Sequence, residues 1–331
     1  MGNGADFILE VTDLVQSFTG KRGFLDRLAG RQARTVHAVN GVSFRVGRGE
    51  VFSLVGESGC GKSTTARTVV RLLEPRSGRI VFDGEDITSY SPSELMPVRK
   101  KMQMIFQDPY ASLNPRQRIR DIIMEPMLFH RTVSGRGEAA DAALRLLDIV
   151  GFRPEQADRY PHQFSGGQRQ RIGIARALAT NPAFIVADEP VSALDVSIQA
   201  QVLNLMMDLR DEFGLSYLFI AHDLSVVRHV TERLGIMYLG FIVEQGDRDS
   251  IFGRPLHPYT RALLAAAPAL DKRQRGEPLQ GDVPSPIDLP PGCPFESRCP
   301  RRMEVCARSR PSLANVEGRM VACHLYPEDG L

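Results

Sequence analysis

Hydrophobic and polar residues alternate along two early stretches of the chain, residues 7–16 and 36–46. Alternation with a period of two residues is typical of strands that bury one face. We therefore expect an opening strand at 7–16 and a hairpin-like pair of strands at 36–46, which together form an antiparallel layer. The intervening segment, 19–34, is rich in Gly, Lys and Arg and is predicted to be a solvated insertion.

Short apolar runs then alternate with segments of helical spacing. The runs predict buried strands at 51–55, 78–84, 102–106, 184–188 and 216–221. Helical spacing occurs at 65–73 and at 119–149 with a break at 134–137, and a further helix is expected just after residues 165–168 and running through Leu178. Strands separated by helices imply an α/β fold, with a parallel sheet that carries its reactive residues at the carboxyl ends of the strands.

The periodicity is lost beyond Pro255, where prolines punctuate the chain. We therefore expect one large domain over residues 1–265, with a helical insert at about residues 110–180. Residues 266–331 are predicted to form a Pro-rich linker and a small cysteine-bearing extension.

Composition narrows the class of protein. The 331 residues are 43% hydrophobic and 24% charged, which is enough for a full core. A net charge of +2 without long blocks of one sign gives no reason to expect nucleic acid as a partner. No apolar stretch approaches the roughly 20 residues of a membrane-spanning helix, and the first residues lack the form of a signal peptide, so we expect the chain to stay in the cytosol.

A phosphate-binding loop follows the strand at 51–55. The pattern G-x-x-x-x-G-K-[ST] is matched without a gap by Gly56, Glu57, Ser58, Gly59, Cys60, Gly61, Lys62, Ser63 and Thr64. The flanking strand and helix favour this interpretation over an ordinary Gly-rich turn. Backbone N–H groups and the helix N-terminus would bind phosphate oxygens, Lys62 would reach the β and γ phosphates, and the Ser63 hydroxyl would ligate Mg²⁺.

Acidic and histidine side chains follow two other strands. Asp188 and Glu189 close the strand at 184–188, and His222 follows the strand at 216–221. In this arrangement Asp188 would hold Mg²⁺ and Glu189 would polarise the attacking water. His222 would hydrogen-bond the γ-phosphate, although a lone histidine is more often structural.

Together with these residues, three further motifs resemble those of the ATP-binding subunit of an ABC transporter. Gln107 matches the Q-loop glutamine, residues 164–168 (Phe-Ser-Gly-Gly-Gln) match the signature, and residues 192–195 match the D-loop. The resemblance implies catalytic roles for Glu189, His222 and Lys62, and Mg²⁺ ligands at Ser63, Gln107 and Asp188. The implied ATP contacts are His37, the loop from Gly56 to Thr64, Gln107, Ser165, Gly166, Gly167, Gln168 and Asp195. Because the signature grips ATP bound on a second subunit, the resemblance also implies a head-to-tail dimer.

The amino-acid sequence resembles that of the dipeptide and oligopeptide importer subfamily at four places: residues 106–115, 187–197, 257–264 and 292–300. Residues 109–114 are most similar to the second of its two ATP-binding subunits. The resemblance implies a non-identical ATP-binding partner, two membrane permease subunits and, indirectly, an extracytoplasmic solute-binding protein. It also implies a peripheral location on the cytoplasmic face of the inner membrane. His37 departs from the family by replacing the usual aromatic residue over adenine, with Phe24 as another candidate, and Phe164 replaces the commoner leucine.

Three functions compete at this point. The leading one is an ATPase motor that drives peptide uptake through a permease, with glutathione-like compounds or nickel complexes also open as solutes. The second is a soluble ABC-type ATPase acting in repair or translation, although the chain lacks the second nucleotide cassette or coiled-coil insertion usual in those proteins. The third is a metal or iron–sulfur module with a regulatory nucleotide, and the complete catalytic set argues against it.

Four of the five cysteines lie near the end of the chain: Cys293, Cys299, Cys306 and Cys323. Disulfides are disfavoured in a reducing cytosol, so we expect the four thiols to share one centre. Zinc and a [4Fe–4S] cluster both accept four thiolates. The lack of C-x₂-C pairs, and the clusters of similar importer subunits, favour the iron–sulfur cluster in a structural role. Cys60, inside the phosphate-binding loop, is not expected to be a ligand of it.

Overall fold

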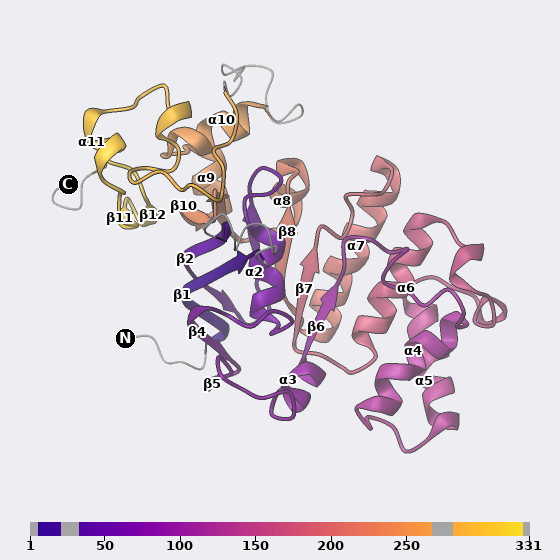
Figure 1. The fold of residues 1–331 in the computed structure, drawn as a ribbon. Coiled ribbons are helices and arrows are strands. Elements are labelled where there is room, and N and C mark those ends of the chain that lie inside the picture. Colours follow the sequence, from indigo (N-terminus) through magenta and orange to yellow (C-terminus); the bar gives the residue numbers. More distant parts are fainter. Residues whose placement is uncertain (1–5, 21–32, 267–280, 327–331) are drawn as a thin grey trace. The chain divides into compact units, whose positions relative to one another are not determined.

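The computed structural model describes residues 6–20, 33–266 and 281–326 (Figure 1). The chain divides into two compact units, each built from several stretches of the sequence. Unit 1 comprises Met1–Ile8, Val46–Val51 and Phe82–Ile220, and unit 2 comprises Leu9–Arg45, Phe52–Val81 and Ala221–Leu331. The phosphate-binding loop and the cysteine-bearing extension therefore belong to the same unit.

A parallel sheet forms the centre of unit 1. Its strands are β6 (Met102–Ile105), β7 (Phe184–Asp188) and β8 (Ser216–Ala221), with β7 in the middle. Every residue of β7 and β8 is buried, which explains why both are continuous apolar runs. Asp188 lies opposite Ile220, so β7 and β8 end at the same level. The predicted strands and their parallel arrangement are confirmed.

Three helices of unit 1 pack against one another and form the predicted helical insert (Figure 1). They are α4 (Ile119–Phe129), α5 (Arg136–Ile149) and α6 (Gly166–Leu178). The break expected at 134–137 is the start of α5. The other elements of unit 1 are β5 (Glu85–Asp86), α3 (Leu95–Lys101), η1 (Pro154–Gln156), η2 (Pro161–Gln163) and α7 (Val196–Phe213).

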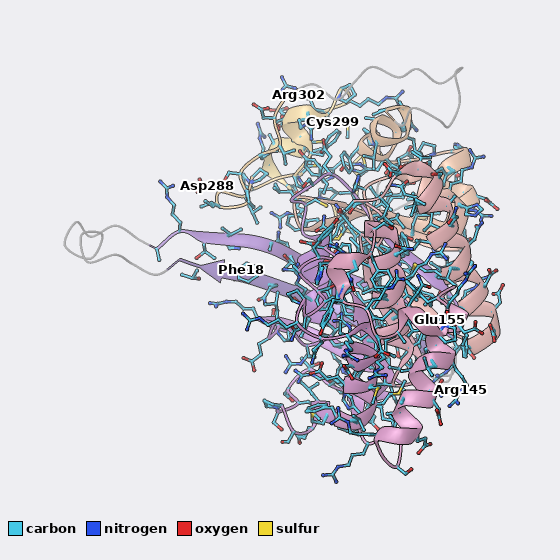
Figure 2. The ribbon with its side chains drawn as sticks, turned by 90° about the vertical axis from the view of Figure 1, so that its right-hand side faces the viewer. Phe18, Arg145, Glu155, Asp288, Cys299 and Arg302 are labelled. Carbon is cyan, nitrogen blue, oxygen red and sulfur yellow. The ribbon has the colours of Figure 1, made fainter. Side chains whose placement is uncertain are left out.

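The predicted antiparallel layer lies in unit 2. It contains β1 (Phe7–Thr19), β2 (Thr35–Gly47) and β4 (Ser77–Phe82), in the order β2-β1-β4. Phe18, near the end of β1, is 43% exposed (Figure 2). The hairpin-like pair predicted at 36–46 is wrong, because β2 is one continuous strand. The backbone N–H of Asn40 donates to the carbonyl of Gly240 at 2.9 Å, and the residues on both sides of Asn40 stay in the strand.

The phosphate-binding loop follows β3, one of a second set of paired strands in unit 2. Here β3 (Val51–Val55) runs parallel to β9 (Arg233–Tyr238), and β10 (Phe241–Asp247) returns antiparallel to β9. All five residues of β3 are buried. The helices in the described part of this unit are α2 (Lys62–Val69), α8 (Leu224–Val230), α9 (Arg248–Gly253), α10 (Pro258–Ala266), η3 (Glu296–Arg298) and α11 (Glu304–Arg308).

The cysteine-bearing extension continues this second set of strands. Strands β11 (Ala314–Val316) and β12 (Arg319–Val321) form a hairpin, and β12 pairs with β10. The sequence analysis did not predict these strands, nor α10, because the strands are short and the helix begins at a proline, Pro258. The boundary expected at residue 266 stays a prediction, since residues 267–280 lie outside the described part.

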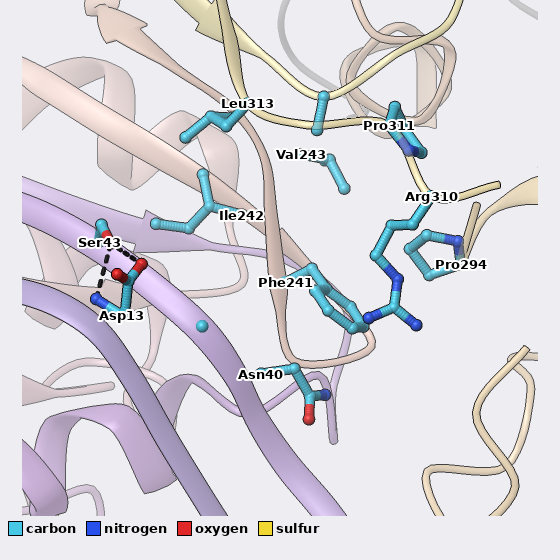
Figure 3. A pocket seen from close by; sticks show the side chains of 12 residues that line it. Asp13, Asn40, Ser43, Phe241, Ile242, Val243, Pro294, Arg310, Pro311 and Leu313 are labelled. Atoms are coloured by element: carbon cyan, nitrogen blue, oxygen red, sulfur yellow. Dashed lines mark hydrogen bonds between the residues drawn. The ribbon is translucent and has the colours of Figure 1, made fainter. Parts of the chain in front are cut away.

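A cavity of about 330 Å³ lies where the extension meets the β strands of unit 2 (Figure 3). The ring of Phe241 forms part of its wall, and the Arg310 guanidinium lies 4.2 Å from the centre of that ring. A cation over an aromatic face is attracted by the ring quadrupole. This contact ties the extension to β10.

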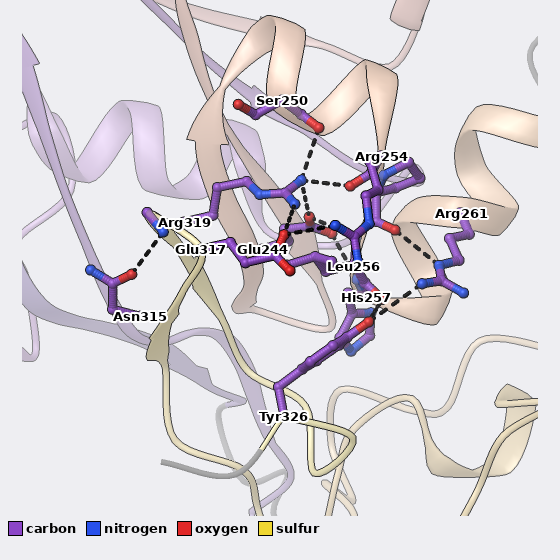
Figure 4. Close-up of polar contacts among 12 residues, drawn as sticks. Glu244, Ser250, Arg254, Leu256, His257, Arg261, Asn315, Glu317, Arg319 and Tyr326 are labelled. Atoms are coloured by element: carbon purple, nitrogen blue, oxygen red, sulfur yellow. Dashed lines mark hydrogen bonds and ion pairs between the residues drawn. The ribbon is translucent and has the colours of Figure 1, made fainter. Parts of the chain in front are cut away.

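A buried charged pair, Glu244 and Arg319, also connects the extension to β10 (Figure 4). Glu244 of β10 is fully buried, and its carboxylate accepts the backbone N–H groups of Leu256 and His257 at 3.0 and 2.9 Å. The guanidinium of Arg319, on β12, lies 3.6 Å from the same carboxylate and donates to the carbonyl of Ser250 at 2.8 Å. A buried charge is tolerated when it is paired and hydrogen-bonded. One carboxylate therefore links β10, the start of α10 and the extension.

Candidate functional site: the phosphate-binding loop and the catalytic strand ends

The backbone of the phosphate-binding loop passes too close to its neighbours for side chains at two positions. A Cβ atom on Gly56 would lie 2.2 Å from the carbonyl oxygen of Met237, and one on Gly61 would lie 2.1 Å from that of Ala38. Gly61 also has a φ of 106°, in the left-handed region that favours glycine. Packing against β2 and β9 thus explains both glycines.

Lys62 begins α2 and is only 4% exposed. Its ammonium donates hydrogen bonds to the carbonyl oxygens of Gly56 and Glu57, at 2.7 and 3.0 Å. The side chain therefore folds back over the loop and places a positive charge at the N-terminus of α2. Ser63 and Thr64 follow in the first turn of α2 and are partly exposed. A lysine at a helix N-terminus is suited to the phosphates of a nucleotide.

Cys60, also in the loop, is 4% exposed, and its Sγ lies 3.8 Å from the Lys62 ammonium. Burial raises the pKa of this thiol. Cys60 is therefore a buried part of the loop, while the other four cysteines lie in the extension.

Glu57 is held from outside the loop at two points that the sequence analysis missed. Its backbone N–H donates to the Tyr259 hydroxyl at 3.0 Å. Its carboxylate receives both arms of the Arg298 guanidinium, at 2.7 and 3.1 Å. Both partners lie more than 200 residues further along the chain, and no local pattern in the sequence indicates the pairing.

In unit 1, Gln107 and Glu189 meet at the carboxyl ends of β6 and β7. The Gln107 amide donates to the Glu189 carboxylate at 2.8 Å. Glu189 has a φ of 46°, a left-handed conformation that is uncommon for residues other than glycine, and its N–H donates to the carbonyl of Ile220 at 3.1 Å. Backbone strain of this kind often accompanies functional residues. Asp188, one residue before, is fully buried.

The signature motif forms the start of α6. Ser165 is the N-cap, and it forms a capping box with Gln168: the Ser165 hydroxyl accepts the Gln168 N–H at 3.4 Å, and the Gln168 side chain accepts the Ser165 N–H at 3.0 Å. Phe164, where the family usually has leucine, is buried edge-on against Phe152. The phenylalanine at this position therefore packs in the core.

The D-loop packs directly against the signature. Asp195 is the N-cap of α7, and Ile198 in the first turn lies so close to Gly167 that a Cβ there would come within 2.3 Å of it. The two segments that the family resemblance assigns to nucleotide contact thus support each other within unit 1.

The remaining predicted residues belong to unit 2. His222 is exposed just before α8, whose N-cap Asp223 accepts the Ser225 N–H at 2.8 Å. His37, on β2, is half-buried, and its N–H donates to the carbonyl of Pro286 at 2.8 Å. Its stacking on adenine stays a prediction, and the other candidate, Phe24, lies outside the described residues.

The four thiols of the extension are free of disulfides. The pKa of Cys293 is raised to about 11, chiefly by burial, and the nearby thiols of Cys306, Cys323 and Cys299 add to the rise. Burial likewise raises the pKa of Cys299 and Cys323. Among the residues that the structure describes, no three His, Cys, Asp or Glu side chains are arranged to hold one metal ion. The described geometry therefore gives no support to a preformed single-ion site.

None of the described helices combines the length and the apolar character that crossing a membrane requires.

Comparisons with known proteins agree with this geometry. The profile of the ABC transporter family matches residues 39–192, and that of the oligopeptide/dipeptide transporter C-terminal region matches residues 243–306. The dimeric, post-hydrolysis structure of the ATP-binding cassette MJ0796 bound to ADP and Pi has a TM-score of 0.63 and 28% sequence identity, covering 72% of this chain and 98% of that one.

Two curated relatives extend over nearly the whole chain. The putative oligopeptide transport ATP-binding protein YkfD of Bacillus subtilis is 51% identical over 325 residues, which are 96% of this chain and 95% of that protein. The dipeptide transport ATP-binding protein DppF of Escherichia coli is 47% identical, over 97% of this chain and 95% of its own length. The chain therefore belongs to the ATP-binding subunits of ABC transporters, in the dipeptide and oligopeptide transporter subfamily, and uses ATP and Mg²⁺ as that family does.

Proposed function

We propose that this chain is an ATP-hydrolysing motor subunit of an ABC importer, and that it drives uptake of dipeptides and oligopeptides through a membrane permease. The observation that carries the proposal is the contact between Gln107 and Glu189 at the ends of two parallel strands. The contact supports the proposal because a carboxylate is the group that a general base requires. The names of the relatives supply the class of solute.

The residues of the chain have separate tasks in this proposal. Lys62 neutralises the β and γ phosphates, while Ser63, Gln107 and Asp188 hold Mg²⁺, which neutralises charge between those phosphates. Glu189 accepts a proton from the attacking water, and His222 hydrogen-bonds the γ-phosphate. Because the Gln107 amide donates to Glu189, it also holds that carboxylate in one orientation.

The signature gives the proposed assembly. Ser165 is the N-cap of α6, Gly166 and Gly167 follow it, and the N-terminus of a helix favours phosphate oxygens. We propose that this surface closes over ATP held by a second, non-identical ATP-binding subunit. The pair would dock on two permease subunits at the cytoplasmic face of the inner membrane, with an extracytoplasmic binding protein delivering the solute.

Reconstitution tests the function. The chain is co-purified with its native membrane partners, and the complex is placed in liposomes that enclose MgATP, with its solute-binding protein outside. A labelled dipeptide should accumulate in proportion to the ATP consumed, and Glu189→Gln in this chain should abolish uptake. If the complex took up nickel complexes or glutathione but no peptide, the proposed class of solute would be wrong. ATP hydrolysis by a chain that associates with no permease would instead favour a soluble ABC-type ATPase.

We also propose that the four thiols of the extension hold a structural [4Fe–4S] cluster. The other three thiols contribute to the raised pKa of Cys293, which supports the view that the four cysteines lie near one another. The choice of a cluster over zinc rests on the spacing of the four cysteines, which lacks the C-x₂-C pairs of zinc ribbons. Because a ligand thiol must lose its proton, the raised pKa values imply that binding releases protons.

A further inference from the structure

The phosphate-binding loop is anchored by a charge that comes from the cysteine-bearing extension. Arg298 lies in the short helix η3, and its side chain is only 4% exposed. Both guanidinium arms reach Glu57, whose side chain is 29% exposed, in a fork at 2.7 and 3.1 Å. A two-armed contact fixes both the position and the plane of the carboxylate. The Glu57 pairing is also the first cause of the raised pKa of Arg298.

Arg298 lies beside a cluster of three aromatic rings, and its guanidinium carbon is 5.8 Å from the centre of the Tyr238 ring. The centre of the Phe295 ring lies 5.2 Å from that of Tyr238 and 5.4 Å from that of Tyr259, and the centres of the two tyrosine rings lie 4.7 Å apart. All three side chains are fully buried. Since Phe295 is three residues before Arg298, and the Arg298 N–H donates to the Phe295 carbonyl at 3.1 Å, the orientation of the arginine follows from the aromatic core.

Glu57 itself is an unfavourable residue for binding a triphosphate. It is the second residue of a loop that surrounds phosphate, and like charges in proximity repel each other. The Arg298 charge offsets the carboxylate and holds it in the fork. At the same time, the Tyr259 hydroxyl holds the Glu57 N–H at 3.0 Å. The extension and α10 thus control the same loop residue by side chain and by backbone.

We propose that Arg298 is a positioning residue for ATP: from the extension it pairs with Glu57, and thereby keeps the phosphate-binding loop shaped and neutral enough to bind the triphosphate. The inference rests on ATP binding by the loop and is independent of the transported solute. It gives the extension a direct part in nucleotide affinity, in addition to any ligand of its thiols.

The first test measures MgATP kinetics of the assembled transporter, and binding of a non-hydrolysable ATP analogue to the full-length subunit. In Arg298→Met, we expect KM and the analogue Kd to rise about tenfold, less than orphaning a fully buried charge would cause, because Glu57 is partly exposed. The kcat should stay within about threefold, since Arg298 touches no reacting atom. An unchanged KM and Kd, or a loss confined to kcat, would overturn the proposal.

The second test separates charge neutralisation from general stability. Adding Glu57→Gln to Arg298→Met removes the orphaned carboxylate, so the double variant should bind the analogue at least threefold more tightly than Arg298→Met alone, a coupling of the kind that double-mutant cycles detect. A double variant that binds no better would contradict the proposal. If Arg298→Met does not fold, Arg298→Lys keeps the charge but loses the fork, and its Kd should rise by a smaller factor. An unchanged Kd in that variant would equally contradict the proposal.

The extension supplies a matched control. Arg302, four residues later, is 68% exposed and pairs with Glu296 at 3.5 Å, away from the loop, and Figure 2 labels it beside Cys299. Arg302→Met removes the same charge from the same segment, so KM and Kd should stay at wild-type values. If Arg302→Met weakened ATP binding as much as Arg298→Met, the effect would belong to the net charge of the extension. Analogue binding is measurable without any transport, so failure of the transport proposal would leave this test intact.

Discussion

The amide of Gln107 donates a hydrogen bond of 2.8 Å to the carboxylate of Glu189, 82 residues further along the chain. The two residues follow neighbouring parallel strands, β6 and β7, whose register brings their carboxyl ends together. A carboxylate accepts hydrogen bonds through two oxygens, so one bond does not exhaust its capacity. That geometry leads to the first prediction.

Glu189→Gln should preserve ATP binding and remove hydrolysis, because an amide fits the space of the carboxylate but accepts no proton from water. The loss in turnover should be about 10²-fold or more, the usual range for a lost general base. Phosphate release and analogue binding measure the two effects. Glu155→Gln, at an exposed glutamate of η1, is the control and should retain full turnover. Near-normal hydrolysis by the Glu189 variant would refute the assignment.

Gly167→Ala should destabilise unit 1 and weaken the signature. The added Cβ would lie 2.3 Å from the branched side chain of Ile198, which has little freedom to withdraw. Gly173, in the same helix, has nothing within 4 Å of the corresponding point. Gly173→Ala should therefore raise stability by about 0.4–1 kcal/mol, as alanine does at an unstrained helical glycine. Denaturant unfolding and ATPase assays compare the two, and equal behaviour would show that the D-loop contact is unimportant.

Stability should fall with acid through His257. Burial lowers its pKa to about 3, and its Nδ1 accepts the Tyr259 N–H, which requires the neutral ring. In the unfolded chain the imidazole of His257 is protonated below about pH 6.5. In the folded chain it is protonated only below about pH 3. The stabilisation is therefore complete above pH 6.5 and is lost as the pH falls toward 3.

Between pH 7 and pH 5 the loss should amount to about 2 kcal/mol from this one group. His257→Asn places an oxygen where it can accept the same N–H, as asparagine does at helix N-caps, but does not titrate. Its melting temperature should fall less than that of the wild type between pH 7 and pH 5. His229→Asn, at an exposed histidine of α8, is the control. Parallel pH profiles of wild type and the His257 variant would exclude this histidine as the cause.

Anaerobic purification should give brown protein with about four iron and four sulfide per chain, the content of a [4Fe–4S] cluster. Cys299→Ser should lose the colour and loosen the extension, which limited proteolysis would detect. Cys60→Ser serves as the comparison and should keep the iron, because Cys60 lies in the phosphate-binding loop. Colourless protein that contains one zinc ion would contradict the cluster and favour a zinc site. Metal-free protein in which all four thiols can be alkylated would contradict any shared site.

The sequence predicted best the elements whose apolar periodicity coincides with their burial. Strand β7 is an apolar run that ends in Asp188 because all of its residues are buried, and α6 begins at the Ser-Gly-Gly-Gln stretch that was expected to precede a helix. The phosphate-binding loop was likewise predictable, because its glycines are required by the close approach of neighbouring backbone.

Contacts between distant segments escaped the prediction. Asn40 and Gly41 have the composition of a turn, yet tertiary hydrogen bonds to the β9–β10 connection keep β2 continuous. Helix α10 lacks a conventional capping residue, because the imidazole of His257 performs that task. The fork between Arg298 and Glu57 joins residues 241 positions apart, and nothing in the local sequence of either indicates the other.

The pairing of β12 with β10 gives the extension a protective role. Glu244 lies opposite Val321, and Gln245 lies opposite Met320. A chain cut at residue 266 would leave the backbone N–H and C=O groups on this side of β10 unpaired. An unpaired strand edge is a template on which other chains can add strands and aggregate. Shortened versions of the protein that end after α10 should therefore be poorly soluble, whatever happens to their ATPase site.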